Sequence, residues 1–307
     1  MHGTTHGLRT ESAPRVIELE RQRPEWKTWL RLLVESDRAM DDAGRGTPFA
    51  EVEADPAAAG AQDGTPLLHG RALAIDAVRS QRLVGRLAAL ASAGDMQGAA
   101  SLRGYHPSPA ATVELLQTAV RRDQAGMDLL AEAARVEAGA LAAVANLAAL
   151  PPLRSCGRLL QARAPRHWPH GYCPICASGP ILVEQRGLDR SRWARCGRCG
   201  GQWQAQWLCC IYCGEREHEK LGSLVPEEGG EVLKVETCAS CRGYLKSVTT
   251  LQPLPPFELL LRDLETVELD LVALDRGYRR TADSGFALDV RIVARAFRPG
   301  RRRPADG

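Results

Sequence analysis

The sequence predicts an α+β fold with a helical N-terminal domain, two four-cysteine knuckle lobes and a C-terminal helix. One observation is that all ten cysteines lie between Cys156 and Cys241, so the first 155 residues contain none. The other is that the hydrophobic pattern changes from helical spacing to short, strand-like segments at about the same place. The predicted parts are a helical domain at 1–160 with a loop or linker at 42–70, a first metal-binding lobe at 161–205, a second at 206–256, a helix at 257–280 and a tail at 281–307.

Length and composition indicate an ordinary globular chain. Its 307 residues are enough for two domains, and 44% of them are hydrophobic and 25% charged. No run approaches eighteen apolar residues, so we predict no membrane span. The polar N-terminus has the pattern of neither a secretory nor a twin-arginine export signal. We therefore expect a cytoplasmic protein, in which clustered cysteines bind metal or react rather than form disulfides.

The N-terminal half is predicted to be helical. Apolar residues recur at helical spacing over 26–40 and over 78–90, and the second of these helices should stop near Gly94. An alanine-rich stretch over 109–150 should be divided by its glycines and ended by Pro151-Pro152. No catalytic motif is present in this half.

The rest of the chain favours short strands, one helix and a tail. Strand-type residues occur in "PILVEQ" and "GYLKSVTTL", and a last helix is expected from Glu258 to about Asp275. Residues 276–303 hold nine arginines against two aspartates. A basic tail can bind nucleic acid or an acidic protein patch, but the absence of apolar periodicity favours a solvated, partly disordered tail.

Four C-x-x-C pairs occur within 69 residues. The pairs are Cys173 with Cys176, Cys196 with Cys199, Cys210 with Cys213, and Cys238 with Cys241. Nineteen residues separate the first two pairs and twenty-four separate the last two. Tetrahedral four-cysteine sites have two such pairs about 15 to 20 residues apart. The spacing predicts two metal sites, with these eight cysteines as ligands.

Redox chemistry is the alternative for these pairs, but a redox C-x-x-C motif normally stands alone at a helix N-terminus. An all-thiolate site suits zinc and iron about equally, and spacing does not decide between them. Four protein ligands leave no open position for a substrate, so we do not predict an enzyme. Outside the pairs, we expect Cys156 to be a small buried residue, Cys209 a packed thiol and His218 a surface residue.

The segment from Tyr172 to Arg280 resembles the formate dehydrogenase accessory protein family, FdhE. The resemblance rests on the order of "YCPIC", "RWARCGRCGGQWQ", "CIYC", "ETCASCRGYLK" and "RDLETVELDLVALDRGY". It implies two rubredoxin-like, or zinc-ribbon-like, knuckle sets that bind iron through the eight paired cysteines, with zinc as the alternative metal. It also implies a cytoplasmic, non-enzymatic factor that helps a respiratory formate dehydrogenase mature by binding its catalytic subunit before export.

Two other functional classes compete with this interpretation. A nucleic-acid-binding double zinc ribbon is favoured by the arginines and tryptophans near the first site, which are Arg186, Arg190, Arg192, Arg195, Arg198, Trp193 and Trp203. Six glutamates around the second site, and a net charge of only +3, disfavour a phosphate ligand. A rubredoxin-type electron carrier would not need a large helical domain. The sequence leaves open whether the chain forms a homo-oligomer.

Overall fold

The computed structural model describes residues 7–43, 49–52, 64–227, 232–281 and 285–295. The chain divides into two compact units. The first comprises Met1–Pro56, Gly70–Cys156 and Asp289–Gly307, and the second comprises Ala57–His69 and Gly157–Leu288. The chain therefore leaves and re-enters each unit, and neither unit is a single continuous segment.

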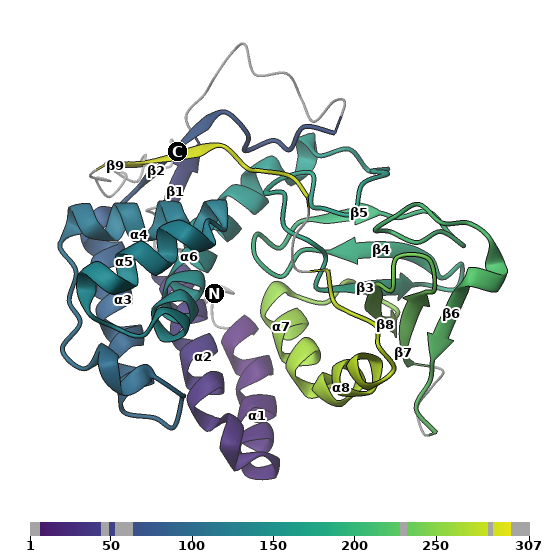
Figure 1. Cartoon of the computed structure of the whole chain (residues 1–307), viewed down its shortest axis with the longest axis horizontal. Helices are drawn as coiled ribbons and strands as arrows, with labels where there is room; N and C mark the ends of the chain where they lie inside the picture. Colours follow the sequence, from purple (N-terminus) through teal and green to yellow (C-terminus); the bar gives the residue numbers. More distant parts are fainter. Residues whose placement is uncertain (1–6, 44–48, 53–63, 228–231, 282–284, 296–307) are drawn as a thin grey trace, which may run out of the picture. The chain divides into compact units, whose positions relative to one another are not determined.

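The first unit is built mainly of helices (Figure 1). Its helices are α1 (Gly7–Gln22), α2 (Lys27–Ala43), α3 (Ala77–Ser92), α4 (Pro109–Arg121), α5 (Gln124–Ala134) and α6 (Ala138–Leu160), the last four residues of which belong to the second unit. Side chains cap three of these helices. Asp76, Ser108 and Asp123 accept hydrogen bonds from backbone N–H groups three residues later, at the starts of α3, α4 and α5.

The alanine-rich stretch is divided as expected, but not at the glycines. The breaks fall at Asp123, which caps α5, and at Glu137, whose Oε2 atom accepts a hydrogen bond of 2.6 Å from the backbone N–H of Ala140. Capping carboxylates that satisfy unpaired N–H groups decide where these helices begin. Gly126 and Gly139 lie just inside the helices that follow.

The prediction that Pro151-Pro152 ends the helix is wrong, because α6 continues through both prolines to Leu160. A proline has no N–H and leaves the carbonyl four residues earlier without its helical partner, which for Pro151 is the carbonyl of Leu147. The Ser36 hydroxyl donates a hydrogen bond of 2.7 Å to that carbonyl. A side chain from α2 thus supplies the hydrogen bond that the proline cannot make.

A three-stranded sheet completes the first unit, and two of its strands, β1 and β9, lie in segments predicted to be loop and tail. Its strands are β1 (Ala50–Val52), β2 (Arg71–Ile75) and β9 (Val290–Ala294), in the order β1-β2-β9. The prediction of a tail over 281–307 is therefore wrong for β9, in which buried Val290 and Ile292 flank exposed Arg291. Residues 44–48 and 53–63 of the predicted linker, and 296–307 of the predicted tail, lie outside the described residues.

The second unit contains one six-stranded sheet rather than two separate lobes. Its strands are β3 (Leu182–Arg186), β4 (Ser191–Arg195), β5 (Gln202–Gln204), β6 (Leu221–Leu224), β7 (Leu233–Cys238) and β8 (Tyr244–Thr250). The order is β5-β4-β3-β8-β7-β6, with β3 and β8 parallel and the other neighbours antiparallel. The β3–β8 pairing joins the two predicted lobes into a continuous sheet.

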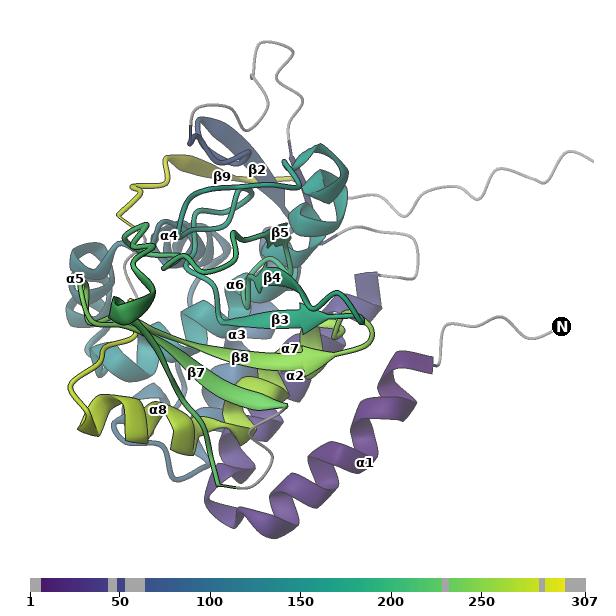
Figure 2. The same cartoon turned by 90° about the vertical axis from the view of Figure 1, so that its right-hand side faces the viewer.

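Two helices pack on one face of this sheet where one helix was predicted (Figure 2). They are α7 (Pro256–Glu265) and α8 (Val267–Asp275). The break falls at Thr266, whose hydroxyl donates to the carbonyls of Arg262 and Asp263 and so competes with the helical hydrogen bonds. Lys246 on β8 is buried beneath the helices, and its Nζ atom lies 2.7 Å from Asp263 and 2.6 Å from Asp270.

A second buried charge cluster lies near the centre of the sheet. Glu184 on β3 is fully buried and forms ion pairs with Arg186, at 2.5 Å, and with Arg195 on β4. The backbone N–H of Leu254 also donates to the carboxylate, and Arg195 donates to the Leu254 carbonyl. This single carboxylate pairs with two guanidinium groups and helps to hold the segment before α7 against the sheet.

Among the described residues, no single helix is long and apolar enough to cross a membrane. Only when taken together are Gln124–Ala134 and Ala138–Arg163 long and apolar enough for a membrane span, and the chain bends by 113° between them.

We predict that Glu184→Gln destabilises the second unit by about 3–5 kcal/mol, because it leaves two buried guanidinium groups without a counter-charge. The measurement is chemical denaturation followed by circular dichroism. The control is Glu18→Gln, which removes an exposed ion pair to Arg21 and should leave the transition unchanged. Equal, small effects of the two substitutions would show that the buried cluster contributes no net stability.

Candidate metal centres

A β-hairpin joins the two cysteine pairs of each candidate centre. The β3–β4 hairpin connects the first pair to the second, and its ends meet where Leu182 pairs with Arg195. The β6–β7 hairpin connects the third pair to the fourth, and Leu221 there pairs with Cys238. Because a hairpin returns the chain to its starting point, the turns before and after it come together. The number of residues between the pairs thus reflects the length of a hairpin.

Among the described residues, two groups of four cysteines could each hold a metal ion, and the sulfurs of each group lie within 4.8 Å of one another. We call Cys173, Cys176, Cys196 and Cys199 the buried group, and Cys210, Cys213, Cys238 and Cys241 the open group. The pairs are combined as their spacing predicts.

The sulfur–sulfur distances suit a tetrahedral ion. Across the buried group they are 3.5 Å, from Cys173 to Cys199 and from Cys176 to Cys196. The corresponding distances across the open group are 3.7 Å. Metal–sulfur bonds of about 2.3 Å place the sulfurs of a tetrahedron about 3.8 Å apart. A disulfide would bring them to about 2.05 Å, and none of the ten cysteines, all of which lie in described residues, forms one.

All four knuckles adopt the same turn. The residue after the second cysteine has a left-handed backbone in each, with φ of +59° at Ala177, +74° at Gly200, +76° at Gly214 and +57° at Arg242. Glycine adopts this conformation without strain, and Ala177 and Arg242 take it at a steric cost. The turn directs N–H groups at sulfur: the N–H groups of Ile175, Gly201 and Gly243 donate to Cys173, Cys199 and Cys241.

The buried sulfurs cannot all ionise by themselves. Burial raises the pKa of the Cys173 thiol well above its ordinary value. Hydrogen bonding to Cys173 raises the pKa of Cys199. The same sulfur contacts lower the pKa of Cys176, which accepts hydrogen bonds from its neighbours. Four thiolates so close together in a buried site would repel one another, so a cation would be needed to keep them together. The donor set fits such a cation, because tetrahedral thiolate ligation suits both zinc and iron.

Burial separates the two groups. The sulfur-bearing residues of the buried group are at most 2% exposed. In the open group Cys213 is exposed and Cys241 half-buried, whereas Cys210 and Cys238 are buried. The two groups have matching local geometry and different access to solvent.

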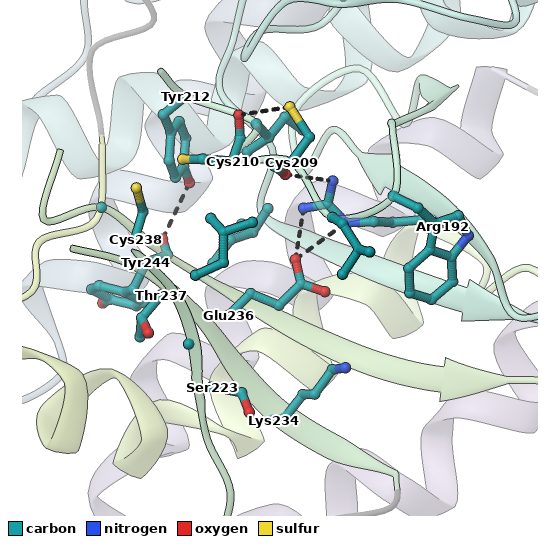
Figure 3. Close-up of a pocket in the computed structure, with 17 residues that line it drawn as sticks. Arg192, Cys209, Cys210, Tyr212, Ser223, Lys234, Glu236, Thr237, Cys238 and Tyr244 are labelled. Atoms are coloured by element: carbon teal, nitrogen blue, oxygen red, sulfur yellow. Dashed lines mark hydrogen bonds and ion pairs between the residues drawn. The ribbon is translucent and has the colours of Figure 1, made fainter. Parts of the chain in front are cut away.

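A pocket with a volume of about 260 Å³ adjoins the open group (Figure 3). Cys210 and Cys238 line it together with the ring of Tyr212. Arg192 from β4 crosses the pocket to Glu236 on β7, with an N–O distance of 2.6 Å. The same guanidinium also donates to the carbonyls of Gln206 and Cys209. Arg192 thus ties the loop that carries the third pair to both halves of the sheet.

The cysteines and histidine outside the pairs belong to neither group. Cys156 is buried in the first unit, and His218 is exposed. Cys209 is half-buried beside the pocket, and its thiol contacts the Cys210 carbonyl at 3.7 Å. Sequence reasoning missed the link between Glu215 and Ser240, whose hydroxyl donates a hydrogen bond of 2.6 Å across the two knuckles of the open group. Serine between two ligands is not a recognisable signal in the sequence.

Comparison with known proteins places the third and fourth knuckles in a described domain. The model of the FdhE C-terminal domain matches residues 208–286. An FdhE homologue from Stutzerimonas stutzeri is 37% identical over 113 residues, which are 36% of this chain and 36% of that protein. One from Pseudomonas aeruginosa is 34% identical over 116 residues, which are 35% of this chain and 37% of that protein. One from Aquifex aeolicus is 27% identical over 117 residues, which are 36% of this chain and 40% of that protein.

The matched stretch therefore spans 36% of the first of these relatives and no more than 40% of the others. The crystal structure of the FdhE protein from Pseudomonas aeruginosa superposes with a TM-score of 0.56 at 21% identity, over 88% of this chain and 92% of that one. That likeness shows a shared fold. The domain model and the curated relatives confirm the resemblance to the FdhE family that the sequence motifs indicate.

We predict that the chain binds two metal ions and that Cys241→Ser removes one of them. The substitution leaves three thiolates in the open group and should lower both the metal content and the thermal stability of the second unit. The measurement is metal analysis of protein purified without oxygen, with a thermal melt. Cys156→Ala, which changes a cysteine outside both groups, should retain both ions. Unchanged stoichiometry and melting temperature in Cys241→Ser would contradict the assignment.

Proposed function

We propose that this chain is a non-enzymatic accessory factor that binds the catalytic subunit of a respiratory formate dehydrogenase in the cytoplasm, before that subunit is exported. The observation that carries the proposal is the FdhE C-terminal domain over residues 208–286, which contains the open group. The relatives support a formate dehydrogenase accessory role through their family, and the details of maturation before export are our inference.

The geometry of the two groups supports a structural role for their metals. Each group supplies four sulfurs, which complete the coordination of a tetrahedral ion. With all four positions taken by protein, an ion would hold knuckles together and would not polarise a substrate. The family resemblance leads us to infer iron at both groups, and zinc is the alternative because tetrahedral thiolate ligation accepts either metal. The eight paired cysteines would be the ligands.

The structure weakens the nucleic-acid-binding alternative. Three of the arginines that favoured it are buried in ion pairs: Arg186 and Arg195 with Glu184, and Arg192 with Glu236. Trp203 is also fully buried. Side chains in such positions cannot reach a phosphate backbone, which basic residues must contact at the surface.

A surface beside the open group suits a protein client better. Trp207 and Leu208 line the pocket and are both largely exposed. Leu208 has a left-handed backbone with φ of +47°, which is unfavourable for a bulky residue. Exposed apolar side chains around a hollow are typical of protein interaction sites. Because Cys210 and Cys238 form part of the same pocket, metal binding would also maintain its shape.

We predict that the full chain retains the catalytic subunit of a formate dehydrogenase from the same cell in a pull-down assay. Trp207→Ala combined with Leu208→Ser should weaken retention about tenfold or more, as expected for an aromatic anchor at an interface. The matched control is Leu188→Ser, which changes a 99% exposed leucine in the β3–β4 turn, away from the pocket.

The competing function is tested in the same assay with a random DNA or RNA duplex at moderate salt. Retention of the subunit, reduced in the pocket variant and unchanged in Leu188→Ser, is the expected result. Tight, salt-sensitive binding of the duplex without retention of the subunit would overturn the proposal in favour of a zinc ribbon. If the double variant at Trp207 and Leu208 retains the subunit as well as Leu188→Ser does, the client does not bind at the pocket.

A further inference from the structure

We propose that the two metal centres have different roles in metal exchange: the open group exchanges its ion with thiol ligands in solution, whereas the buried group holds its ion permanently. The inference rests on the proposed metal binding by both groups and does not depend on the proposed client. It follows from what covers each group, from the cavities beside the open group and from the hydrogen bonds that join the knuckles.

Segments distant in sequence cover the buried group. The N–H groups of Leu67 and Leu68 donate hydrogen bonds of 2.8 and 3.0 Å to the carbonyls of Pro174 and Ile175, inside the first knuckle. The end of α6 packs on the second knuckle so closely that a Cβ atom at Gly157 would lie 1.9 Å from the Cys199 carbonyl oxygen. Release of an ion from this group requires these segments to separate.

The second knuckle of the buried group is held further by hydrogen bonds and by α7. Gln161 both donates to the carbonyl of Gln202 and accepts from its N–H, which fixes the strand after the knuckle. Pro256, at the start of α7, lies against Gly200. Opening of this group is therefore coupled to disruption of packing around the sheet, which has a free-energy cost approaching that of unfolding the unit.

Short-range hydrogen bonds shape each knuckle of the open group. Within the third knuckle, the N–H of Cys210 donates to the Glu215 carbonyl and that of Gly214 to the Cys210 carbonyl. The fourth knuckle has the corresponding bond from Cys238 to Gly243. Side chains join the two knuckles in two places: Ser240 donates to Glu215, and the Tyr212 hydroxyl donates to the carbonyl of Tyr244, just after the fourth knuckle. The fourth knuckle is also tied to the segment after α8, because Arg242 donates to the carbonyls of Arg276 and Gly277. The open group thus differs from the buried group in the exposure of its ligands and in the cavities beside it.

Two cavities reach the open group. The pocket in Figure 3 is lined by Cys210 and Cys238. A second cavity, with a volume of about 450 Å³, is lined by Cys213. Three of the four sulfur-bearing residues thus border a space into which a small ligand fits, and Cys213 is also exposed. No member of the buried group lines either cavity.

Exchange at such a group is a ligand substitution with no change of oxidation state. An exposed cysteine gives up its bond to the ion as an incoming thiolate forms one, and the released cysteine thiolate takes a proton from water. Cys213 should leave first, because it is the ligand most accessible to solvent. The remaining cysteines then follow as the knuckles separate. The incoming ligand should be a thiolate, because soft sulfur ligands suit the ions that four-cysteine groups bind.

The test uses the full chain loaded with zinc without oxygen. Excess dithiol chelator is added, and the release of zinc is followed with a chromogenic indicator. We predict two phases of equal amplitude, with the open group releasing its ion about tenfold or more faster than the buried group. Solvent and the two cavities give an incoming thiolate access to the open group, whereas the buried group must first separate from the segments packed over it. Timed alkylation with N-ethylmaleimide, read by mass spectrometry, assigns each phase to its cysteines in the unmodified protein.

In that assignment, Cys213 and Cys241 should be alkylated during the fast phase, and Cys196 and Cys199 during the slow one. Ser240→Ala should accelerate the fast phase by about two- to tenfold, because it removes one hydrogen bond between the knuckles. The matched control is Ser178→Ala, which removes a hydroxyl that contacts Cys176 in the buried group and should leave the fast phase unchanged.

Release of both ions at one rate, or alkylation of the buried group first, would overturn this inference while leaving the proposed metal binding intact. Failure to take up zinc at all would overturn the metal proposal and this inference with it. Neither result bears on retention of the formate dehydrogenase subunit, which is measured separately.

Discussion

Bringing two C-x-x-C turns together is the constraint on which the second unit depends. Each turn supplies two sulfurs, so a four-sulfur group forms only if the chain returns to its starting point between the pairs. Hairpins β3–β4 and β6–β7 provide that return. Each hairpin adds strands, and the parallel pairing of β3 with β8 unites them in one sheet. The sheet is thus a consequence of how the sulfurs are brought together.

The sheet also buries charged side chains, which need partners of opposite charge. Its strands carry Glu184, Arg195 and Lys246 at buried positions, where an unpaired charge would be strongly destabilising. The compensating groups come from neighbouring strands and from α7 and α8, with Asp263 and Asp270 contacting Lys246. These ion pairs specify how the helices sit on the sheet, while the apolar contacts among Leu182, Val248 and Leu259 supply the burial.

Identical local geometry does not make the two sulfur groups equivalent. All four knuckles share a left-handed residue after the second cysteine, and the sulfur spacings differ by only a few tenths of an ångström. The environment differs instead: chain segments from 67–68 and 157–161 cover one group, whereas a pocket and solvent border the other. A domain that carries one protected and one accessible centre can combine a stable framework with a surface that responds to its metal.

The sequence by itself determined the candidate ligands and their grouping, because residue type, C-x-x-C spacing and turn residues are properties of short segments. It also indicated the helical half, through apolar spacing over stretches such as 78–90. Contacts between distant residues decided the rest. Val183 pairs with Ser247 to join two predicted lobes, and Ser36 satisfies the Leu147 carbonyl so that α6 passes through Pro151. β9 becomes a strand because β2 offers it an edge. Burial of one cysteine group and exposure of the other likewise depend on segments packed from elsewhere in the chain, which no local pattern records.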